Sequence, residues 1–296
     1  MNAETADAVR KANSHQPGEW GEWVGRTEEI SEEISAQRVQ ALAATLDLDA
    51  TVHPGTPLPP GWHWLFFNPI ARRSELGADG HPARGGFLPP IQLPRRMWAG
   101  GRLNYLAPAP IGSRASRRSE ILKIESKSGR RGQLIFVTVR HTISFNGTDC
   151  VSEEQDIVYR EAPPPGGAGL SAEPAPTGAE HEREIRPDPV LLFRYSALTF
   201  NGHRIHYDRR YAQEEEHYRD LVVHGPLTAT LLQNLAVSLG GLGQRLSRFE
   251  FRGVNPLFVD RPFRLGARQE SSNIMTLWAA GPEGELAMAA KAFFAV

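Results

Sequence analysis

Alternating apolar and polar positions mark two series of strand-like runs, one in each half of the chain. In the first series the dipeptides Ser128-Gly129 and Asn146-Gly147 stand between the runs and are typical of tight turns. Each series therefore predicts a set of antiparallel strands. The predicted strands are 119–129, 132–147 and 150–161 in the first half, and 245–254, 257–265, 273–280 and 285–296 in the second.

An apolar helix is predicted before each series. Residues 30–48 have apolar side chains at helical spacing, with Thr27 as the N-cap and Glu29 in the first turn. Residues 225–241 predict a second helix, with Pro226 in its first turn and glycines at its end. A long apolar helix followed by antiparallel strands suggests a sheet wrapped around a buried helix, which gives an α+β class.

The segment 163–180 divides the chain. It is rich in Pro, Gly and Ala, and Leu170 is its only large apolar side chain, so it buries too little surface to offset its ordering entropy. We therefore expect a linker there. The expected units around it are an N-terminal helical segment 1–50, a first domain 51–162 and a C-terminal domain 181–296.

Composition and charge exclude several classes. Hydrophobic residues make up 40% and charged residues 23%, as in ordinary globular proteins. The net charge of -1 argues against a general nucleic-acid binder, which needs a basic excess. The single cysteine, Cys150, excludes a disulfide framework. We find no secretory signal and no run of about 18 apolar residues, so we expect a cytoplasmic protein with no membrane contact.

Groups suited to proton chemistry lie close together in the second half. Asn201, His203 and His206 fall within six positions. Histidine suits proton transfer because its unperturbed pKa, about 6.5, lies near operating pH. Farther along, "HGPL" at 224–227 places a glycine just before an apolar helix. Free N–H groups and the helix dipole at such a start suit a developing oxyanion.

Two stretches carry a resemblance to a known family. "FRYSALTFNGHRIHYD", followed by "LVVHGPL" at 221–227, resembles the hydratase motif of the MaoC-like acyl-thioester dehydratases. The branch it resembles is that of hydroxyacyl-thioester dehydratase type 2 and the mesaconyl-CoA or itaconyl-CoA hydratases. "GGFLPPIQLPRRMWAGGRLNY" at 85–105 is similar to the N-terminal domain of that branch. The resemblance implies a double hot-dog fold with a degenerate first half and a catalytic second half.

The same resemblance implies a hydro-lyase that needs no cofactor and adds water to an α,β-unsaturated acyl thioester. His206 matches the catalytic histidine, and Gly225 would hold the enolate oxygen through its N–H. An Asp precedes that histidine by five residues in the family, whereas this chain has Asn201, an amide that holds water but cannot act as a base. The expected substrate-binding residues are His203, His224, Arg84, Arg95, Arg96 and Trp98.

The acyl group and its carrier stay open at this point. Coenzyme A and acyl carrier protein would present the same reacting atoms. An arginine among Arg84, Arg95, Arg96 and Arg102 could pair with a substrate carboxylate or with coenzyme A phosphates. The resemblance favours a short, branched dicarboxylyl-CoA such as mesaconyl-CoA or itaconyl-CoA, ahead of a fatty-acid type of 3-hydroxyacyl thioester.

Other functions are kept as alternatives. Metal binding would use His203 and His206 with His224 or His217, but the spacing matches no standard pattern such as HExxH. A hot-dog thioesterase would share the fold. A non-catalytic acyl-thioester binder would explain the amide of Asn201. A homodimer is a further expectation.

Overall fold

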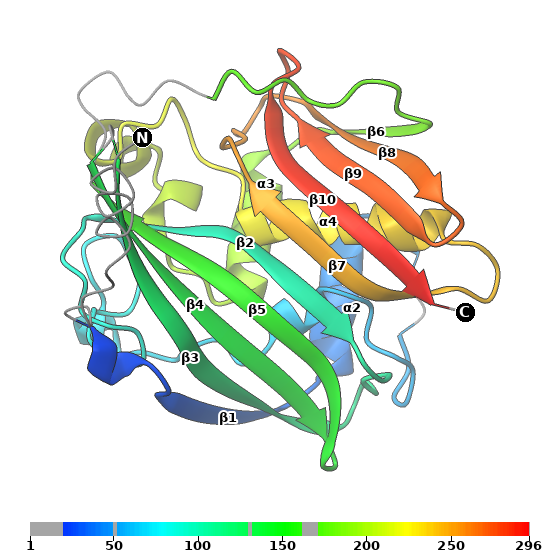
Figure 1. The fold of residues 1–296 in the computed structure, drawn as a ribbon, viewed down its shortest axis with the longest axis horizontal. Helices are drawn as coiled ribbons and strands as arrows, with labels where there is room; N and C mark the ends of the chain where they lie inside the picture. The colour runs from blue at the N-terminus through cyan, green and yellow to red at the C-terminus, as the bar shows by residue number, and fades with distance from the viewer. Residues whose placement is uncertain (1–19, 50–51, 130–131, 162–170, 296) are drawn as a thin grey trace, which may run out of the picture.

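The computed structural model describes residues 20–49, 52–129, 132–161 and 171–295. They form one ten-stranded sheet in which all neighbouring strands are antiparallel. The sheet curves across the molecule, and the helices lie on one side of it (Figure 1). The strand order is β1-β3-β4-β5-β2-β7-β10-β9-β8-β6.

Both halves place their strands in the same order from the sheet edge to the centre. The first half contains β1 (Thr27–Glu33), α2 (Ala36–Thr45), β2 (Arg95–Tyr105), β3 (Arg114–Gly129), β4 (Gly132–Phe145) and β5 (Thr148–Arg160). The second half contains β6 (His181–Ile185), α3 (Pro189–Leu198), α4 (Gly225–Leu239), β7 (Arg245–Gly253), β8 (Phe263–Ser271), β9 (Ile274–Ala280) and β10 (Leu286–Ala295). The repeated order confirms an α+β double hot-dog fold, with β2 and β7 paired at its centre.

Short helical turns fill the connections. They are η1 (Gly21–Trp23), η2 (Trp62–Leu65), η3 (Arg73–Glu75), η4 (Arg204–His206) and η5 (Tyr211–Glu215). No helix among the described residues has the length and apolar character that a bilayer crossing needs.

Two adjacent glycines let the halves share one sheet. Gly101 pairs with Phe251 across the junction between β2 and β7. A Cβ at Gly100 would overlap the backbone of Phe251, and one at Gly101 would press on the Phe251 ring. The glycines in "WAGGR" are therefore needed for the close approach of the two halves.

Helix α4 is the buried helix predicted over 225–241. Pro226 lies in its first turn and Gly240 follows its last residue, as expected. The helix packs against the four strands β7 to β10. Leu227 and Leu232 are fully buried, and burial of each stabilises the fold by about 1.5–3 kcal/mol.

The predicted helix start at Thr27 is wrong. Residues Thr27–Glu33 form strand β1, which pairs with β3, and the helix begins only after Ser35. Side chains along β1 alternate in exposure, so Ile30 faces inward while Glu29 faces solvent and lies in no helical turn. The described part of the segment 1–50 therefore contains a strand of the sheet, β1, as well as the helix α2.

The predicted hairpin strands are confirmed with small shifts, and the turn at Asn146-Gly147 has two positive φ angles, 48° and 79°. Residues 257–262 are not part of a strand, since β8 starts at Phe263. Strands β2 and β6 and helix α3 were not predicted. In the expected linker, 163–170 lie outside the described residues. The rest runs beside the second half, with a bridge between Pro174 and Glu285.

Candidate active site

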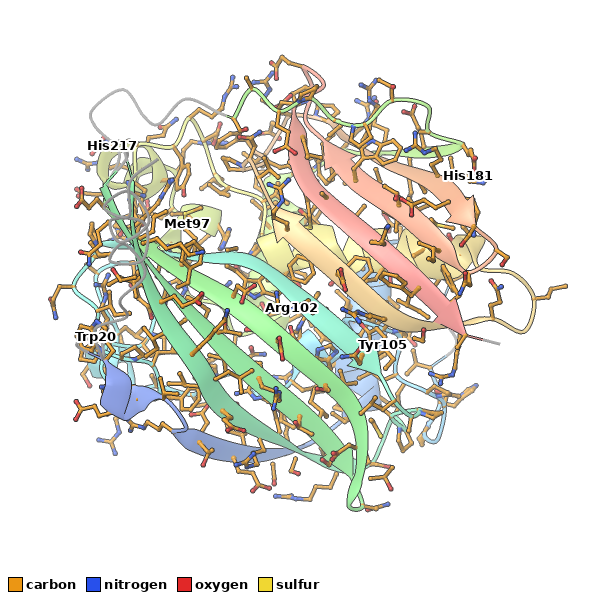
Figure 2. All side chains as sticks on the ribbon, viewed as in Figure 1. Trp20, Met97, Arg102, Tyr105, His181 and His217 are labelled. Atoms are coloured by element: carbon orange, nitrogen blue, oxygen red, sulfur yellow. The ribbon has the colours of Figure 1, made fainter. Side chains whose placement is uncertain are left out.

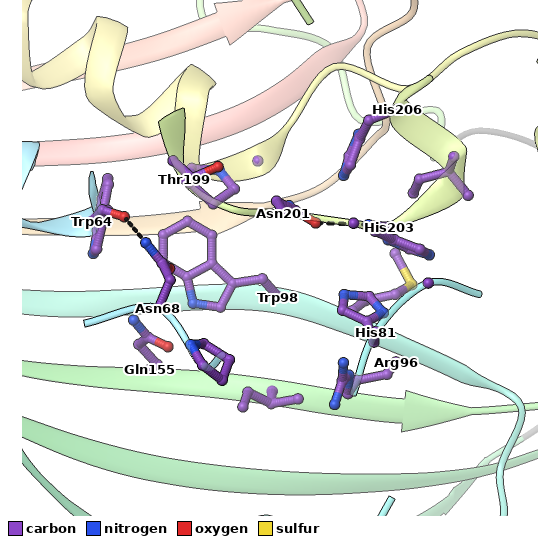
Figure 3. A pocket seen from close by; sticks show the side chains of 18 of the residues that line it. Trp64, Asn68, His81, Arg96, Trp98, Gln155, Thr199, Asn201, His203 and His206 are labelled. Carbon is purple, nitrogen blue, oxygen red and sulfur yellow. Dashed lines mark hydrogen bonds between the residues drawn. The ribbon is translucent and has the colours of Figure 1, made fainter. Parts of the chain in front are cut away.

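A cavity of about 1370 Å³ lies between the two halves and is lined by residues from both (Figure 3). The first half contributes the loop between η2 and β2 and the inner faces of β2, β4 and β5. The second half contributes α3, the segment through η4 and the start of α4. Eight of the nine predicted site residues line this cavity, all except His224. They are Arg84, Arg95, Arg96, Trp98, Asn201, His203, His206 and Gly225.

A sharp turn after α3 presents Asn201 to the cavity. Phe200 has a positive φ of 49°, and the N–H of Asn201 donates to the carbonyl of Ser196 at 2.9 Å. Asn201 Oδ1 accepts the N–H of His203 at 2.9 Å. The amide NH₂ is then the free group of this side chain, so Asn201 offers hydrogen-bond donors to a ligand.

His206 is a neutral imidazole with one free nitrogen. Its Nδ1 lies 2.7 Å from the carbonyl oxygen of Val222, and because a carbonyl only accepts, Nδ1 carries the proton. Burial lowers the pKa of His206 to about 4, although the hydrogen bond to Val222 opposes this. Nε2 therefore keeps its lone pair at neutral pH, the state that a general base needs.

His224 lies behind His206. The two rings stack with centroids 3.7 Å apart, and His224 Nε2 is 2.8 Å from Ser196 Oγ. The side chain of His224 is fully buried, and this burial keeps its pKa well below the usual range. His224 is not among the described residues that line the cavity, so its contact with the substrate stays a prediction. It supports the ring of His206 from the far side.

The start of α4 reaches the cavity at Gly225. His224 is its N-cap but makes no capping hydrogen bond, and the first-turn N–H groups of a helix have no acceptor inside it. Trp98 of β2 lies over this glycine, since a Cβ there would be 3.6 Å from the indole ring. Trp98 packs edge-on against Trp64 at 5.0 Å. The first half thus bounds the space above an uncapped helix start.

The four candidate arginines have different surroundings. Arg95 is buried and forms an ion pair with Glu216. Arg84 donates to the backbone carbonyls of residues 91 and 94. Arg96 lines the cavity beside His81 (Figure 3) and forms no ion pair with any acidic residue in the described ranges.

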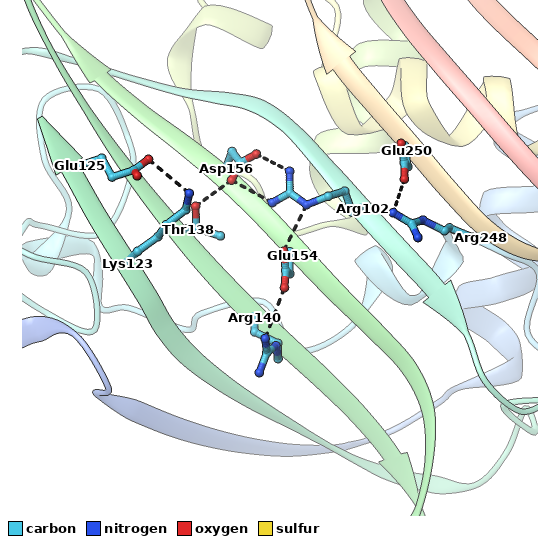
Figure 4. A network of polar contacts seen from close by, with 9 residues as sticks. All are labelled: Arg102, Lys123, Glu125, Thr138, Arg140, Glu154, Asp156, Arg248 and Glu250. Carbon is cyan, nitrogen blue, oxygen red and sulfur yellow. Dashed lines mark hydrogen bonds and ion pairs between the residues drawn. The ribbon is translucent and has the colours of Figure 1, made fainter. Parts of the chain in front are cut away.

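Arg102 lies on the outer face of the sheet (Figure 2). Its guanidinium binds Asp156 at 2.7 Å and Glu154 at 3.1 Å, within a surface network that also includes Arg140 (Figure 4). These contacts hold Arg102 outside the cavity. Arg84 and Arg96 are therefore the two candidates without an ion pair in the described ranges. Because Arg84 already donates to two backbone carbonyls, Arg96 is the better candidate to meet the charge of a ligand.

The first half has a polar inner face that sequence reasoning missed. His63 Nε2 and Glu153 Oε2 are 3.0 Å apart and both side chains are almost fully buried. Burial works to raise the pKa of Glu153, but the hydrogen bond from His63 holds it below its usual range. His141 and Arg117 line the same part of the cavity. His63 lies in η2 and the other three lie on separate strands, so no local motif marks them.

Glu216 was also missed, because "EEEH" at 214–217 reads as the solvated face of a short helix. The structure turns this side chain inward, where it pairs with Arg95 and lies 3.7 Å from His203 Nε2. Burial lowers the pKa of His203 to about 2, helped by the neighbouring imidazoles His81 and His206. His203 is therefore a second neutral imidazole in the cavity wall.

The histidines considered for a metal do not form the closest group of possible ligands. Within the part of the chain that the structure describes, that group is Asp79, His81 and His203, whose ligand atoms lie within 4.8 Å of one another. His217 is exposed at the end of η5. This group of possible ligands shares only His203 with the histidines that the sequence spacing suggested for a metal.

A double hot-dog sheet with a neutral histidine and an uncapped helix start on one cavity defines an acyl-thioester hydratase or dehydratase of the MaoC-like class. Comparisons with known proteins agree. A model of the family "Hydroxyacyl-thioester dehydratase type 2" matches residues 61–259. The chain belongs to this family and is a hydro-lyase acting on acyl thioesters.

A curated relative supports this assignment, and solved structures support the fold. A mesaconyl-C(4)-CoA hydratase of Chloroflexus aurantiacus is 49% identical over 273 residues, which are 92% of this chain and 96% of that protein. A MaoC-like dehydratase from Phytophthora capsici has a TM-score of 0.66 at 12% identity, covering 92% and 95% of the two chains. A Mycobacterium tuberculosis protein with a double hot-dog fold has a TM-score of 0.54 at 14% identity, covering 92% and 96%.

Proposed function

We propose that the protein catalyses reversible hydration of a short α,β-unsaturated acyl-CoA with a free carboxylate, such as mesaconyl-CoA or itaconyl-CoA. The observation that carries this proposal is the pairing of His206 and Gly225 on one cavity. The first is a neutral imidazole with a free Nε2, and the second is the uncapped start of α4. His206 transfers the proton, and the N–H of Gly225 stabilises the negative charge on the enolate oxygen.

The proposed reaction uses one histidine in both proton transfers. His206 Nε2 takes a proton from water as the water oxygen bonds to Cβ. The electron pair of the double bond moves towards the thioester, and the enolate oxygen accepts the N–H of Gly225 at the positive end of α4. The imidazolium then returns its proton to Cα. Asn201 donates its amide N–H to the water oxygen and so holds the water in place.

Arg96 supports a substrate with a carboxylate. In a mesaconyl group joined to coenzyme A through C4, the free carboxylate is on Cβ, the carbon that water attacks. Its partner must therefore lie near His206. Arg96 lies beside His81 and close enough to His203 to influence its pKa, and it forms no ion pair with the described acidic residues. Its planar guanidinium suits bidentate binding of a carboxylate.

The polar inner face of the first half favours a short acyl group. A long alkyl chain against Glu153 and Arg117 would place apolar carbon beside two charged side chains and offer neither of them a hydrogen-bond partner. This argues against the alternative of a fatty-acid type substrate, for which an apolar chamber is suited.

Steady-state kinetics with mesaconyl-CoA, itaconyl-CoA, crotonyl-CoA and dodecenoyl-CoA tests the proposal. Mass spectrometry follows gain of water, and a thiol reagent follows release of coenzyme A. We expect kcat/KM to be at least about 10-fold higher for a carboxylate-bearing substrate than for crotonyl-CoA. Preference for dodecenoyl-CoA would contradict the short-chain proposal, and thiol release without water gain would indicate a thioesterase.

Asn201→Ala and His206→Ala serve as matched variants in that assay. We expect Asn201→Ala to lose about 10-fold in kcat, because one hydrogen bond to the water disappears while the base remains. Substrate binding without any conversion by the wild type would indicate a non-catalytic acyl-thioester binder. The cytoplasmic location and the homodimer stay predictions, and light scattering on the purified protein tests the latter.

A further inference from the structure

A loop from the first half is fixed directly onto the segment that carries His206. Gly80, with φ of 88°, lies against Gly202, and a Cβ on either glycine would collide with the other's carbonyl oxygen. The N–H of Arg204 donates to the carbonyl of Asp79 at 2.9 Å, and its guanidinium donates to Ala78 at 3.0 Å. The position of residues 78–81 is therefore set by contacts with the second half.

This loop holds an aspartate and a histidine in a defined pair. Asp79 Oδ2 accepts from His81 Nδ1 at 2.9 Å, and Asp79 Oδ1 accepts the backbone N–H of His81 at 3.0 Å. Burial works to raise the pKa of Asp79, but the hydrogen bonds from His81 hold it well below its usual range. The carboxylate therefore fixes the proton of His81 on Nδ1 and leaves Nε2 with a lone pair.

His81 continues a row of imidazoles into the cavity. Its ring centroid lies 4.2 Å from that of His203, and His203 lies 5.4 Å from His206. His81, His203 and His206 all line the cavity (Figure 3). His81 and His206 share the same tautomer, one anchored by a carboxylate and the other by the carbonyl of Val222.

We propose that His81, held by Asp79, is a second catalytic group that accepts a hydrogen bond from the second hydrogen of the attacking water. This role rests on the proposed hydratase function. His206 Nε2 removes one proton of the water, and His81 Nε2 binds the other hydrogen without removing it, so the oxygen lone pair is directed at Cβ. In dehydration, His81 accepts the O–H of the 3-hydroxyl group while His206 protonates the departing oxygen. The first half thus supplies the carboxylate that Asn201 lacks.

A hydrogen-bond role fits this geometry better than a metal site. Both oxygens of Asp79 already accept hydrogen bonds from His81, and the Nδ1 of His81 is used in that contact. The charged and titratable groups that face His81 are Asp79 on its own loop, Arg84 and Arg96 from the first half, and His203 from the second.

The test compares His81→Gln and Asp79→Asn with the wild type on mesaconyl-CoA, itaconyl-CoA and crotonyl-CoA. We expect each variant to lose about 100-fold in kcat with KM within about 3-fold, as for the loss of a group acting on the transferred proton. His181→Gln, on the exposed edge strand β6 (Figure 2), is the matched control and should keep the wild-type rate. Circular dichroism checks that each variant is folded.

A pH profile separates this role from a structural one. Protonation of His81 removes its acceptor, so wild-type kcat should fall as pH drops through the pKa of His81. In His81→Gln the limb of His81 should be absent, and the acid limb that remains should belong to His206, whose pKa burial lowers to about 4. In Asp79→Asn the loss of the carboxylate lowers the pKa of His81, so its limb should shift to lower pH. Added imidazole should partly restore the rate of His81→Ala.

Each of the following results would overturn the proposed role of His81. Equal rates and an unchanged acid limb in His81→Gln would overturn the role of His81 while leaving the hydratase function intact, and so would a change confined to KM. Loss of wild-type activity on chelation, restored by Zn²⁺ or Mn²⁺, would assign the cluster to a metal. Absence of hydration by the wild type on all three thioesters would contradict the proposed function and this role with it.

Discussion

The two halves share one strand order but have different inner faces. In the second half, α4 has 15 residues, begins uncapped at Gly225 and lies beside the neutral His206. In the first half, α2 has 10 residues and follows Ser35, and the inner face carries the buried pair of His63 and Glu153. The second half therefore holds the proposed base and the helix start, while the first half supplies other cavity walls, buried charges and the proposed partner His81.

Two halves with the same fold can therefore carry different functional side chains. The curved sheet needs only alternating side chains and a helix to cover, and both halves meet that need. The proposed site uses residues both outside and inside the repeated elements. His206 is in the turn η4, whereas Arg96 is the second residue of strand β2, and both line the cavity.

The largest expected effect is at His206. His206→Ala should lower kcat for hydration by about 10³-fold, because it removes the free Nε2 that takes the proton from water. Stopped assays of water gain on mesaconyl-CoA measure this. A kcat within about 10-fold of the wild-type value would show that His206 is not the base and that the proton is removed by another group. His63→Gln is the matched variant in the first half. Its kcat, calculated per folded molecule, should be higher than that of His206→Ala.

Gly225→Ala should follow, with a loss of about 10²-fold in kcat. The added methyl group has room, since its Cβ would lie 3.6 Å from the ring of Trp98 and Gly225 has no positive φ. The fold should therefore persist while the thioester oxygen is kept from the N–H. Kinetics and thermal unfolding of the same sample measure both. An active variant with normal KM would show that the enolate is held elsewhere.

Arg96→Gln sharpens the role of the first half. We expect kcat/KM to fall by about 10–100-fold for mesaconyl-CoA, the loss of a charge-assisted hydrogen bond. The value for crotonyl-CoA, which has no carboxylate, should change little. Arg102→Gln on the outer face is the control and should leave both substrates unaffected. Equal losses for the two substrates would assign Arg96 to the coenzyme A moiety or to the fold.

The smallest effect is on stability below neutral pH. The pKa of His141 in the first half and that of His206 in the second are lowered to about 4 by burial, and the pKa of His203 to about 2. The unfolded chain binds these protons near pH 6.5 and the folded chain does not, so stability falls as pH falls. Between pH 7.5 and 5.5 each histidine should cost about 1.4 kcal/mol of unfolding free energy.

Urea unfolding at the two pH values measures this loss. His141→Gln should remove only the share of that one histidine, because three of the buried neutral histidines, His203, His206 and His224, lie in the second half. An unchanged urea midpoint between the two pH values would contradict neutral burial of these side chains.

Much of the fold could be predicted from the sequence, because its central elements follow local rules. The alternation in β4 and β5, the Asn146-Gly147 turn and the proline and glycine at the ends of α4 each fix a local structure. Strand β1 was predicted as the start of a helix because Ile30 and Ile34 fit helical spacing as well as the alternation of a strand. Strand β2 was not predicted, because its glycines are needed for the contact with β7 and no local sequence pattern indicates that contact.

The site was predictable only where its residues are close in sequence. Asn201, His203, His206 and Gly225 fall in two short stretches, and the structure places all four on one cavity. Asp79, His81, Glu153 and Glu216 join the site through tertiary contacts between distant segments. Their short polar stretches resemble ordinary surface loops, so only the packing of the two halves reveals them.

Incubation of the purified protein with mesaconyl-CoA in ¹⁸O-labelled water shows whether the protein adds water to the double bond. We expect a product that is heavier by the mass of one labelled water, with the label on the acyl chain, the thioester intact and no free thiol. Label appearing in a free acid together with released coenzyme A, or no mass change while the substrate is bound, would contradict hydration.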